Sequence, residues 1–419
     1  MPKRIAFIDL LFNYPPTGGS WVDVYEVASR LQKKGHEVCL FLPDFTRYTN
    51  RGVIKGNLPF PVKHINFSKF SFNRYTVPQR FMQALDEFKP DYVFMGDGYF
   101  LKPFLVNYLS KKYKMILRFY AYELICGMNN LFQPQLKKNC AWNIINYPIH
   151  CWACVNWNFR TPETSFKILF EHNLNLHRMH FGHEFLSALA FMPDYPNKVK
   201  KALSSTYRIL VYNKFLEEII KPYNNNIQIT PSGIDIQRFT PKKDFSNNTG
   251  TVKILFPGRI NDPVKGFIIV QKALRELWKK RQDFELIITT DDPSYLTDPF
   301  IKNAGWLTQD KLPDLYQSSD ICLVPSYWRE AFGITTLEAM ATALPVIASA
   351  IGGLNHTIED GVSGLHVPPG DADKLREKIE VLMDNETLRA SLGKNARKRV
   401  ESLYNWDAII EKYYEPLFK

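Results

Sequence analysis

The segment of residues 320–353 constrains the fold of this chain more than any other. It opens with Asp320–Val324, an apolar run typical of a short buried strand, and continues through a loop. The residues of Thr336–Ala343 favour a helix, which a proline ends, and Val346–Ser349 begins another apolar strand. The order strand, loop, helix, strand predicts an α/β fold.

The loop in this segment contains residue types that suit a phosphate and a sugar. Gly333 lets the backbone come close to a ligand, and the start of the next helix offers N–H groups and a positive dipole end. Glu330 lies in the loop and Glu338 in the first helical turn, where their carboxylates could accept hydrogen bonds from hydroxyls. Glu338 has a second interpretation, because Thr335 to Glu338 also has the T-x-x-E pattern of a capping box.

The pattern resembles the signature of family 4 retaining glycosyltransferases. Glu330 and Glu338 are separated by seven residues, Phe332-Gly333 lies between them, and Gly352-Gly353 follows. Enzymes of this family use nucleotide-sugar donors and have the GT-B architecture, in which two Rossmann-like domains face a central cleft. The resemblance implies that Glu330 holds hydroxyls of the donor sugar and that Glu338 holds those of the ribose.

A second part of the resemblance follows the predicted strand Val252–Phe256, where Gly258, Arg259 and Lys265 lie beside further glycines. In the family this arginine and lysine hold the donor diphosphate. Two cations beside a leaving diphosphate can replace a metal ion, so we expect a metal-independent enzyme without a cofactor. The alternative is that Arg259 and Lys265 are solvated surface charges.

The resemblance also assigns the N-terminal glycine loop, Gly18-Gly19, to a place near the reacting phosphate. The alternative is an ordinary tight turn between a strand and a helix. Gly305-Trp306 matches the turn that contacts the base. The expected donor-binding residues are therefore Gly18, Gly19, Gly258, Arg259, Lys265, Gly305, Trp306, Glu330, Phe332, Gly333, Ile334, Thr335 and Glu338.

One departure from the family concerns a histidine that contacts the donor sugar or the acceptor. This chain has no histidine at the corresponding place, after the predicted strand Met115–Phe119. Tyr122 is the best match and Tyr120 the alternative. The expected catalytic set is therefore Arg259, Lys265, Glu330 and Tyr122.

The predicted domains are an acceptor-binding domain over 1–238 and a donor-binding domain over 239–400. A last helix, over 405–417, should lie in the segment 401–419 that returns to the first domain, as in the family. The opening strand, glycine loop and helix are Rossmann-like but lack G-x-G-x-x-G, which argues against a nicotinamide or flavin enzyme.

Charge divides the 419-residue chain, whose net charge is +11. Residues 1–225 contain 29 Lys/Arg against 16 Asp/Glu, whereas residues 226–419 contain 24 against 26. The basic half predicts an anionic partner, either an acceptor or a membrane surface. The apolar stripe of residues 100–109 fits a membrane-surface helix or a helix packed on its sheet. The sequence contains no nucleic-acid-binding motif, no signal peptide and no apolar run long enough to span a membrane. We therefore expect a cytoplasmic protein, and its basic half predicts contact with the inner face of the membrane.

Three groups of residues resemble metal ligands but have simpler interpretations. Cys126, Cys140, Cys151 and Cys154 have irregular spacing, and buried free thiols are common. His177, His180 and His183 recur every three residues, with Glu184 as the nearby carboxylate. Asp371-Ala372-Asp373 has a D-x-D form, but its position before a helix favours an N-cap.

The sequence thus predicts a retaining hexosyltransferase that moves a hexose from a nucleotide sugar, with UDP-glucose as the first guess. The acceptor would be a hydroxyl of a glycan or lipid-linked saccharide, as in polysaccharide or glycolipid biosynthesis. Two alternatives remain open at this point. One is a sugar-nucleotide epimerase of the same fold, which would convert the donor without an acceptor, and the other is a non-catalytic binding module.

Overall fold

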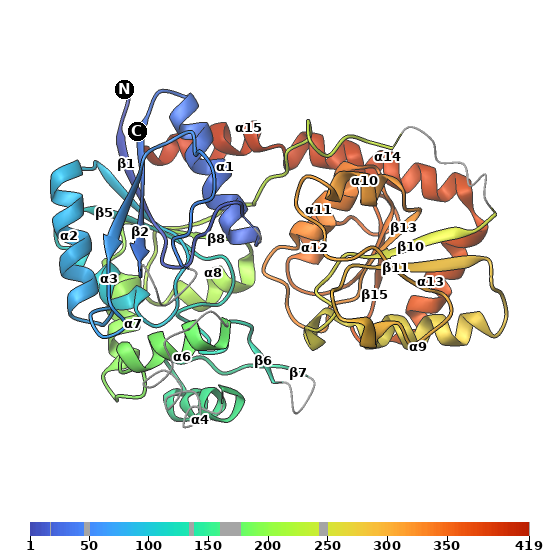
Figure 1. Cartoon of the computed structure of the whole chain (residues 1–419), viewed down its shortest axis with the longest axis horizontal. Coiled ribbons are helices and arrows are strands. Elements are labelled where there is room, and N and C mark those ends of the chain that lie inside the picture. The colour runs from blue at the N-terminus through green and yellow to red at the C-terminus, as the bar shows by residue number, and fades with distance from the viewer. Residues whose placement is uncertain (17, 46–50, 134–137, 160–176, 243–249, 419) are drawn as a thin grey trace. The chain divides into compact units, whose positions relative to one another are not determined.

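The computed structural model of the chain divides into two compact units (Figure 1). The N-terminal unit comprises Met1–Leu131, Cys140–Thr230 and Ile410–Lys419, and the C-terminal unit comprises Phe132–Asn139 and Pro231–Ile409. The structure describes all residues except 17, 46–50, 134–137, 160–176, 243–249 and 419. Within the described part of the chain, no helix is both long enough and apolar enough to cross a bilayer.

The N-terminal unit contains a parallel sheet of seven strands in the order β3-β2-β1-β4-β5-β8-β9. Its strands are β1 (Arg4–Ile8), β2 (Glu37–Asp44), β3 (Val62–Asn66), β4 (Tyr92–Met95), β5 (Lys114–Arg118), β8 (Arg208–Val211) and β9 (Ile227–Ile229). The central strands β1 and β4 are short apolar runs, and nearly all of their residues are buried. A parallel strand covered on both faces needs such a run, which explains why the sequence reveals these strands well.

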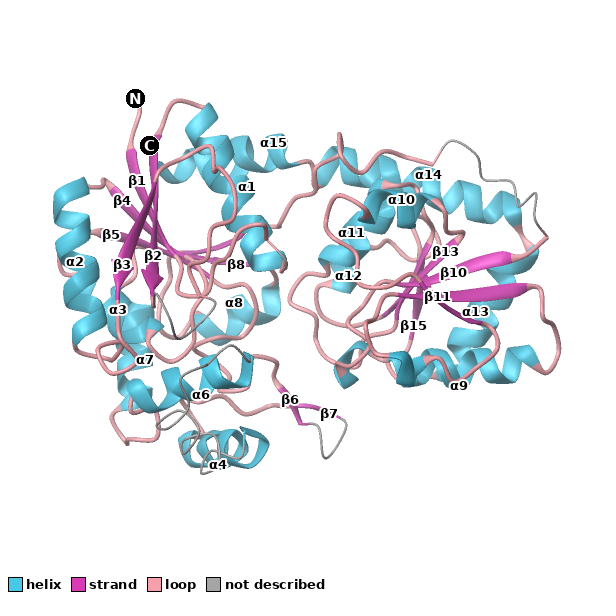
Figure 2. Cartoon of the chain, viewed as in Figure 1, coloured by secondary structure: helices cyan, strands magenta, loops and turns pink. Residues whose placement is uncertain are grey.

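The helices of this unit are α1 (Gly19–Lys33), α2 (Thr76–Phe88), α3 (Lys102–Leu109), α4 (Pro148–Phe159), α6 (His177–Ser187), α7 (Tyr195–Ser205) and α8 (Lys214–Ile220) (Figure 2). Helix α3 packs against α2 and α7, and most of its residues are buried. The stripe of residues 100–109 therefore belongs to a helix packed inside the unit, and its interpretation as a membrane-surface helix is wrong.

The C-terminal unit contains a second parallel sheet, of six strands in the order β12-β11-β10-β13-β14-β15. They are β10 (Val252–Phe256), β11 (Phe284–Ile288), β12 (Ile301–Asn303), β13 (Ile321–Val324), β14 (Val346–Ser349) and β15 (Leu365–Val367). The helices are α9 (Phe267–Trp278), α10 (Leu312–Gln317), α11 (Ile334–Ala341), α12 (Leu354–Thr357), α13 (Ala372–Asp384), α14 (Glu386–Leu403) and α15 (Trp406–Ile409).

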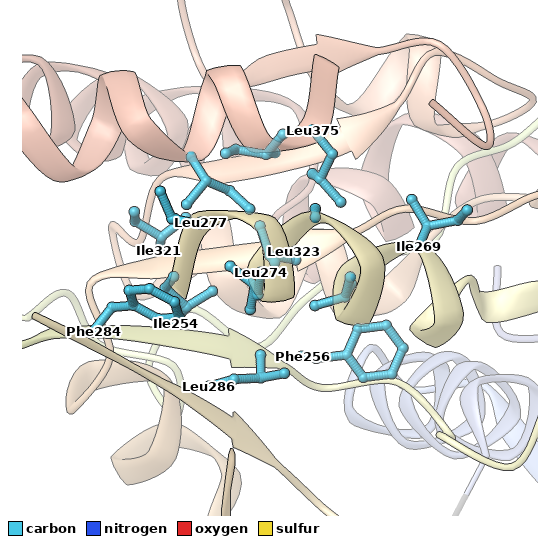
Figure 3. Close-up of a cluster of buried hydrophobic side chains, with 14 of the residues drawn as sticks. Ile254, Phe256, Ile269, Leu274, Leu277, Phe284, Leu286, Ile321, Leu323 and Leu375 are labelled. Carbon is cyan, nitrogen blue, oxygen red and sulfur yellow. The ribbon is translucent and has the colours of Figure 1, made fainter. Parts of the chain in front are cut away.

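Figure 3 shows the core of this sheet, where Leu274 and Leu277 of α9 lie over the strand residues Ile254 and Leu323. All four side chains are fully buried. The predicted order of strand, loop, helix and strand over 320–353 is confirmed as β13, α11 and β14. Because the strands are parallel, the loops that follow β10 and β13 leave the sheet at the same edge.

The C-terminal end of the chain packs on the N-terminal unit. Phe418 contacts the ring of Tyr92 at 5.3 Å between centroids, and Glu415 lies 3.5 Å from the ring nitrogen of His36. The prediction of one helix over 405–417 is wrong. Helix α15 is followed by a π-helical turn, Ile410–Tyr414, and a 3-10 turn, Glu415–Phe418. The proline in that last turn lacks the N–H that a continuous α-helix requires.

Candidate active site

The amino end of α11 is the centre of the candidate site in the C-terminal unit. Gly333 precedes the helix with φ of 98°, and no side chain caps the first turn. A Cβ at Gly333 would lie 2.6 Å from the Leu354 side chain, so both the backbone angle and the space require glycine. Ile334 and Thr335 form the half-buried first turn. The arrangement presents the positive end of the helix dipole at the mouth of the loop.

Glu330 is nearly buried in this loop, with 6% of its surface exposed. Its Oε1 accepts hydrogen bonds from Lys265 Nζ at 2.6 Å and from Ser326 Oγ at 2.8 Å. Burial raises the pKa of Glu330, but the charge and hydrogen bond of Lys265 prevail and hold the pKa below its ordinary value. Glu330 is therefore an ionised acceptor at neutral pH.

Lys265 reaches Glu330 because of the glycine that follows it. Gly266 has φ of 82°, and a Cβ there would lie 2.0 Å from the carbonyl oxygen of Pro325. Only glycine allows this approach between the loops after β10 and β13. The structure thus brings together Lys265 and Glu330, which the sequence placed in the same site without pairing them.

Arg259 and Gly258 lie in the loop after β10. The Arg259 side chain is 63% exposed and lies 3.3 Å from Asp262, so its guanidinium faces solvent. A Cβ at Gly258 would meet the Phe256 ring at 3.2 Å and the Lys265 side chain at 3.7 Å. Gly258 therefore lies against the stem of Lys265, whereas Arg259 is exposed and pairs with Asp262.

Gly352 and Gly353 have a structural role that the motif alone did not reveal. A Cβ on Gly352 would lie 2.5 Å from the Glu330 carbonyl oxygen, and one on Gly353 would lie 2.6 Å from the Ala331 carbonyl oxygen. The Gly353 N–H donates to the Glu330 carbonyl oxygen at 2.7 Å. The two glycines thus hold the loop of Glu330 and Phe332 in place by close backbone packing.

Glu338 does not form a capping box, so that interpretation is wrong. Its Oε2 accepts a hydrogen bond of 2.8 Å from the hydroxyl of Tyr316, which is 22 residues away, instead of turning back to the helix start. Glu338 is 6% exposed. Burial raises its pKa from 4.5 to about 7, although the Tyr316 hydroxyl and the charge of Arg238 oppose the rise. Sequence reasoning missed Tyr316 and Arg238, because neither lies in the motif.

Gly305 and Trp306 follow β12. Gly305 has φ of 72° and its N–H donates to Asn303 Oδ1 at 2.9 Å, which fixes the turn. The Trp306 side chain is 54% exposed. Its indole face can therefore stack on a planar ligand such as a nucleotide base.

In the N-terminal unit, Gly18 and Gly19 begin α1, and a Cβ at Gly18 would meet nothing within 4 Å. Near the same edge of the sheet lie Asp9 and Asp97, which sequence reasoning missed. Asp9 accepts three backbone N–H bonds, including that of Asp97 at 2.7 Å. Burial, followed by the charge of Asp97, raises the pKa of Asp9 to about 8, and burial with the charge of Glu123 raises that of Asp97 to about 6. Both pKa values are raised, so Asp9 carries a proton at neutral pH while Asp97 is largely ionised.

The Tyr122 phenol is fully buried, and its ring lies 6.3 Å from that of Phe215. Tyr120 is also buried. The polar group that shapes this turn is Glu123, which accepts from the backbone N–H of Tyr120 at 3.0 Å and from Lys102 Nζ at 3.0 Å. Neither tyrosine is at the surface of this unit, and the catalytic role of Tyr122 stays a prediction.

No group of three or more His, Cys, Asp or Glu side chains that could hold a metal is present among the described residues. Cys126, Cys140, Cys151 and Cys154 are free thiols. The ring of His183 lies 2.6 Å from the carbonyl oxygen of Lys69, whereas the side chains of His177 and His180 lie outside the described residues. Asp371 accepts from the Lys374 N–H at 2.9 Å, which confirms it as the N-cap of α13.

Residues 237–399 match the family described as "Glycosyl transferases group 1". The D-inositol 3-phosphate glycosyltransferase of an Arthrobacter strain is 29% identical over 47% of this chain and 54% of the relative. The lipopolysaccharide 1,2-N-acetylglucosaminetransferase of Salmonella typhimurium is 24% identical over 100% of this chain and 98% of the relative. The structure of Anabaena HepE in complex with UDP and glucose has a TM-score of 0.66 at 14% identity and covers 99% of each chain.

The chain therefore has the GT-B fold of glycosyltransferases, with two Rossmann-like α/β units. The part that matches the group 1 glycosyl transferases lies in the C-terminal unit and contains most of the candidate donor site. The chain spans about half the length of the D-inositol 3-phosphate glycosyltransferases that it matches.

Proposed function

We propose that this chain is a retaining glycosyltransferase that moves a hexose from a UDP-sugar to a hydroxyl of a glycan or lipid-linked saccharide. UDP-glucose is the first donor to test. The observation that carries the proposal is the pairing of Lys265 with Glu330 beside the uncapped start of α11. A cation, a buried carboxylate and a positive helix end within one loop system suit a ligand that has both a diphosphate and hydroxyls.

The donor diphosphate would lie against the start of α11, where Lys265 and Arg259 supply positive charge. Arg259 is exposed and can turn toward the ligand, whereas Lys265 is held 2.6 Å from Glu330. Glu330 would bind donor sugar hydroxyls with its other carboxylate oxygen, Oε2, beside this pair. Two cations and a helix dipole would stabilise the departing charge, so the reaction needs no divalent metal.

The nucleoside would extend toward Glu338 and Trp306, which belong to the same unit. Glu338 would accept hydrogen bonds from the ribose hydroxyls, and the exposed indole of Trp306 would stack on the base. Because its pKa is raised to about 7, a ligand that donates two hydrogen bonds would favour the ionised form of Glu338.

In the transfer step, the acceptor hydroxyl attacks the anomeric carbon on the side from which the diphosphate leaves. The bond from carbon to the phosphate oxygen breaks as the new glycosidic bond forms, and a phosphate oxygen takes the hydroxyl proton. This route needs no protein nucleophile. The N-terminal unit would bind the acceptor, with Tyr122 as the predicted replacement for the family histidine.

Two comparisons support this choice of substrates. HepE is described in complex with UDP and glucose, and one relative that matches over the whole chain is described as a lipopolysaccharide N-acetylglucosaminetransferase. A lipid-linked acceptor also suits the basic N-terminal half, because anionic headgroups or phosphates attract it. We therefore place the reaction in the cytoplasm, at the inner face of the membrane.

The test is a panel of UDP-sugars incubated with saccharide acceptors, followed by detection of UDP and determination of the product anomer by NMR. Acceptor-dependent UDP release with retained configuration supports the proposal. Conversion of the UDP-sugar without acceptor would instead identify an epimerase. Nucleotide binding without turnover across a broad acceptor screen would identify a binding module.

A further inference from the structure

Helix α4 exposes an apolar face where a surface helix normally has charges. The chain contains no Asp, Glu, Lys or Arg from Asn139 to Phe159. On its outer side, Ile149 is 78% exposed, Trp152 45% and Trp157 76%. A helix at the surface of a domain in water usually turns polar and charged residues outward. These three large side chains give α4 an exposed apolar face.

The orientation of α4 is fixed by its inner side, so the outer face is not free to turn inward. Cys151 and Val155 are buried in the N-terminal unit. A Cβ at Gly127 would lie 2.5 Å from the Val155 side chain, which shows how closely the helix approaches the backbone below it. Figure 2 shows α4 at the edge of this unit, beyond α6 and apart from the seven-stranded sheet.

Two aromatic residues before the helix extend the apolar face. Trp142 is 39% exposed and Tyr147 45%. Their rings lie 6.2 Å apart, and the Trp142 ring lies 4.6 Å from that of His150 in the first turn of α4. We name this face the α4 surface and define it as Trp142, Tyr147, Ile149, Trp152 and Trp157.

We infer that the α4 surface inserts into the interface of an anionic lipid bilayer. Tryptophan and tyrosine favour the level of the headgroups, where the ring is in an apolar environment and its polar atom is in a wet one. A 12-residue helix is about 18 Å long, at about 1.5 Å per residue, whereas the hydrocarbon core is about 30 Å thick. Helix α4 is therefore too short to span the bilayer and would lie flat in the interface.

Charge around the uncharged stretch complements anionic headgroups. Two lysines, Lys137 and Lys138, come directly before it in the sequence, and Arg160 comes directly after it. The N-terminal half as a whole has 13 more basic than acidic residues. An uncharged aromatic stretch with basic residues before and after it in the sequence is typical of a helix that lies in a membrane interface.

The inference rests on the proposed function in one respect, since a lipid-linked acceptor would keep the enzyme at a membrane. Insertion itself needs neither donor nor acceptor. Vesicle binding and sugar transfer to a soluble acceptor can therefore fail independently. A protein that binds vesicles without transferring sugar refutes only the proposed function, and one that transfers sugar but ignores vesicles refutes only this inference.

The experiment is co-sedimentation of the full chain with vesicles of equal phosphatidylcholine and phosphatidylglycerol, at low and high salt. The test variant combines Trp152→Gln and Trp157→Gln, and the control is Ile268→Gln, a residue of α9 that is 62% exposed. We expect the double variant to bind vesicles roughly tenfold or more weakly than the parent, because two large apolar side chains no longer leave water. The control should bind like the parent, and thermal melting of all three should coincide.

Tryptophan fluorescence adds a readout that does not depend on affinity alone. The parent should show a blue shift with vesicles, and brominated lipid should quench its fluorescence. Both effects should be much smaller in the double variant, which keeps only Trp142 among the tryptophans of the α4 surface. Equal vesicle binding by parent and double variant would overturn the inference, as would no binding by the parent. Two further outcomes would also overturn it. If the parent and the control are dimers and the double variant is a monomer, the α4 surface binds a second copy of the chain. If soluble glycans cause the blue shift and vesicles do not, the α4 surface binds a sugar.

Discussion

Replacing Glu338 by Gln should make the protein more stable above pH 7 and weaken its binding of nucleotide. Glu338 is nearly buried, and burial raises its pKa from 4.5 to about 7. A tenfold change in a protonation equilibrium corresponds to about 1.4 kcal/mol, so ionised Glu338 costs the folded state about 3 kcal/mol relative to the unfolded chain. Gln removes this cost, and its amide oxygen can still accept the hydrogen bond from Tyr316.

Whether stability rises or falls with pH depends on whether the folded or the unfolded state binds more protons. Because the pKa of Glu338 is higher in the folded state, the folded protein holds the extra proton between pH 4.5 and 7. Stability from this group is therefore complete below pH 4.5 and is lost as the pH rises toward 7. Urea unfolding from pH 4.5 to pH 8 should show this loss in the parent and a smaller one in Glu338→Gln.

Affinity should change in the opposite direction. If ionised Glu338 accepts hydrogen bonds from the ribose, Gln should weaken UDP binding about ten- to a hundredfold, since a bond to a charged group contributes about 1.5–3 kcal/mol. Calorimetry at pH 8 measures this, and Glu377→Gln on α13 is the matched control, because that carboxylate is about half exposed. An unchanged UDP affinity would refute the ribose role, and an unchanged dependence of stability on pH would refute the argument from burial.

Three other expectations can be tested with the same protein. Glu330→Gln should lower kcat about ten- to a hundredfold, because one charge-assisted hydrogen bond is lost, while UDP affinity changes little. Equal losses in kcat and UDP affinity would contradict a role in binding the donor sugar. Transfer should continue in EDTA because Lys265 and Arg259 supply the charge, and an absolute need for magnesium or manganese would exclude this arrangement. Binding of an anionic acceptor or of anionic vesicles should weaken with salt, and behaviour independent of salt in both assays would remove the role of the basic N-terminal half.

The donor loop could be predicted from sequence because its determinants are close together in the chain. Apolar runs define β13 and β14, and Gly333 has a backbone angle that other residues rarely adopt. The prediction of a capping box at Glu338 was wrong because the residue that Glu338 contacts is distant in the chain. Its alternative partner, the Tyr316 hydroxyl, lies 22 residues before Glu338 and is brought near only by the packing of α10 against α11.

The same limit applies to the carboxylates of the N-terminal unit. Asp9 and Asp97 follow different strands, β1 and β4, and nothing in either local pattern indicates a pair. They meet because the two strands are neighbours in a parallel sheet, so that both loops leave at one edge. The backbone N–H of Asp97 then donates to Asp9 at 2.7 Å.

Helix α4 illustrates a different limit, because periodicity identifies apolar residues without saying which of them are covered. The stripe of residues 100–109 and the residues of α4 are both rich in large apolar side chains. In the structure, α3 buries its stripe against α2 and α7, whereas α4 buries Cys151 and Val155 and exposes Trp152 and Trp157. The sequence suggested a membrane-surface helix at residues 100–109, but the structure buries that stripe. The exposed apolar side chains that such a helix needs belong to α4 instead. If α4 is the anchor, the basic charge of this half draws the protein to the lipid, and the tryptophans set how long it stays.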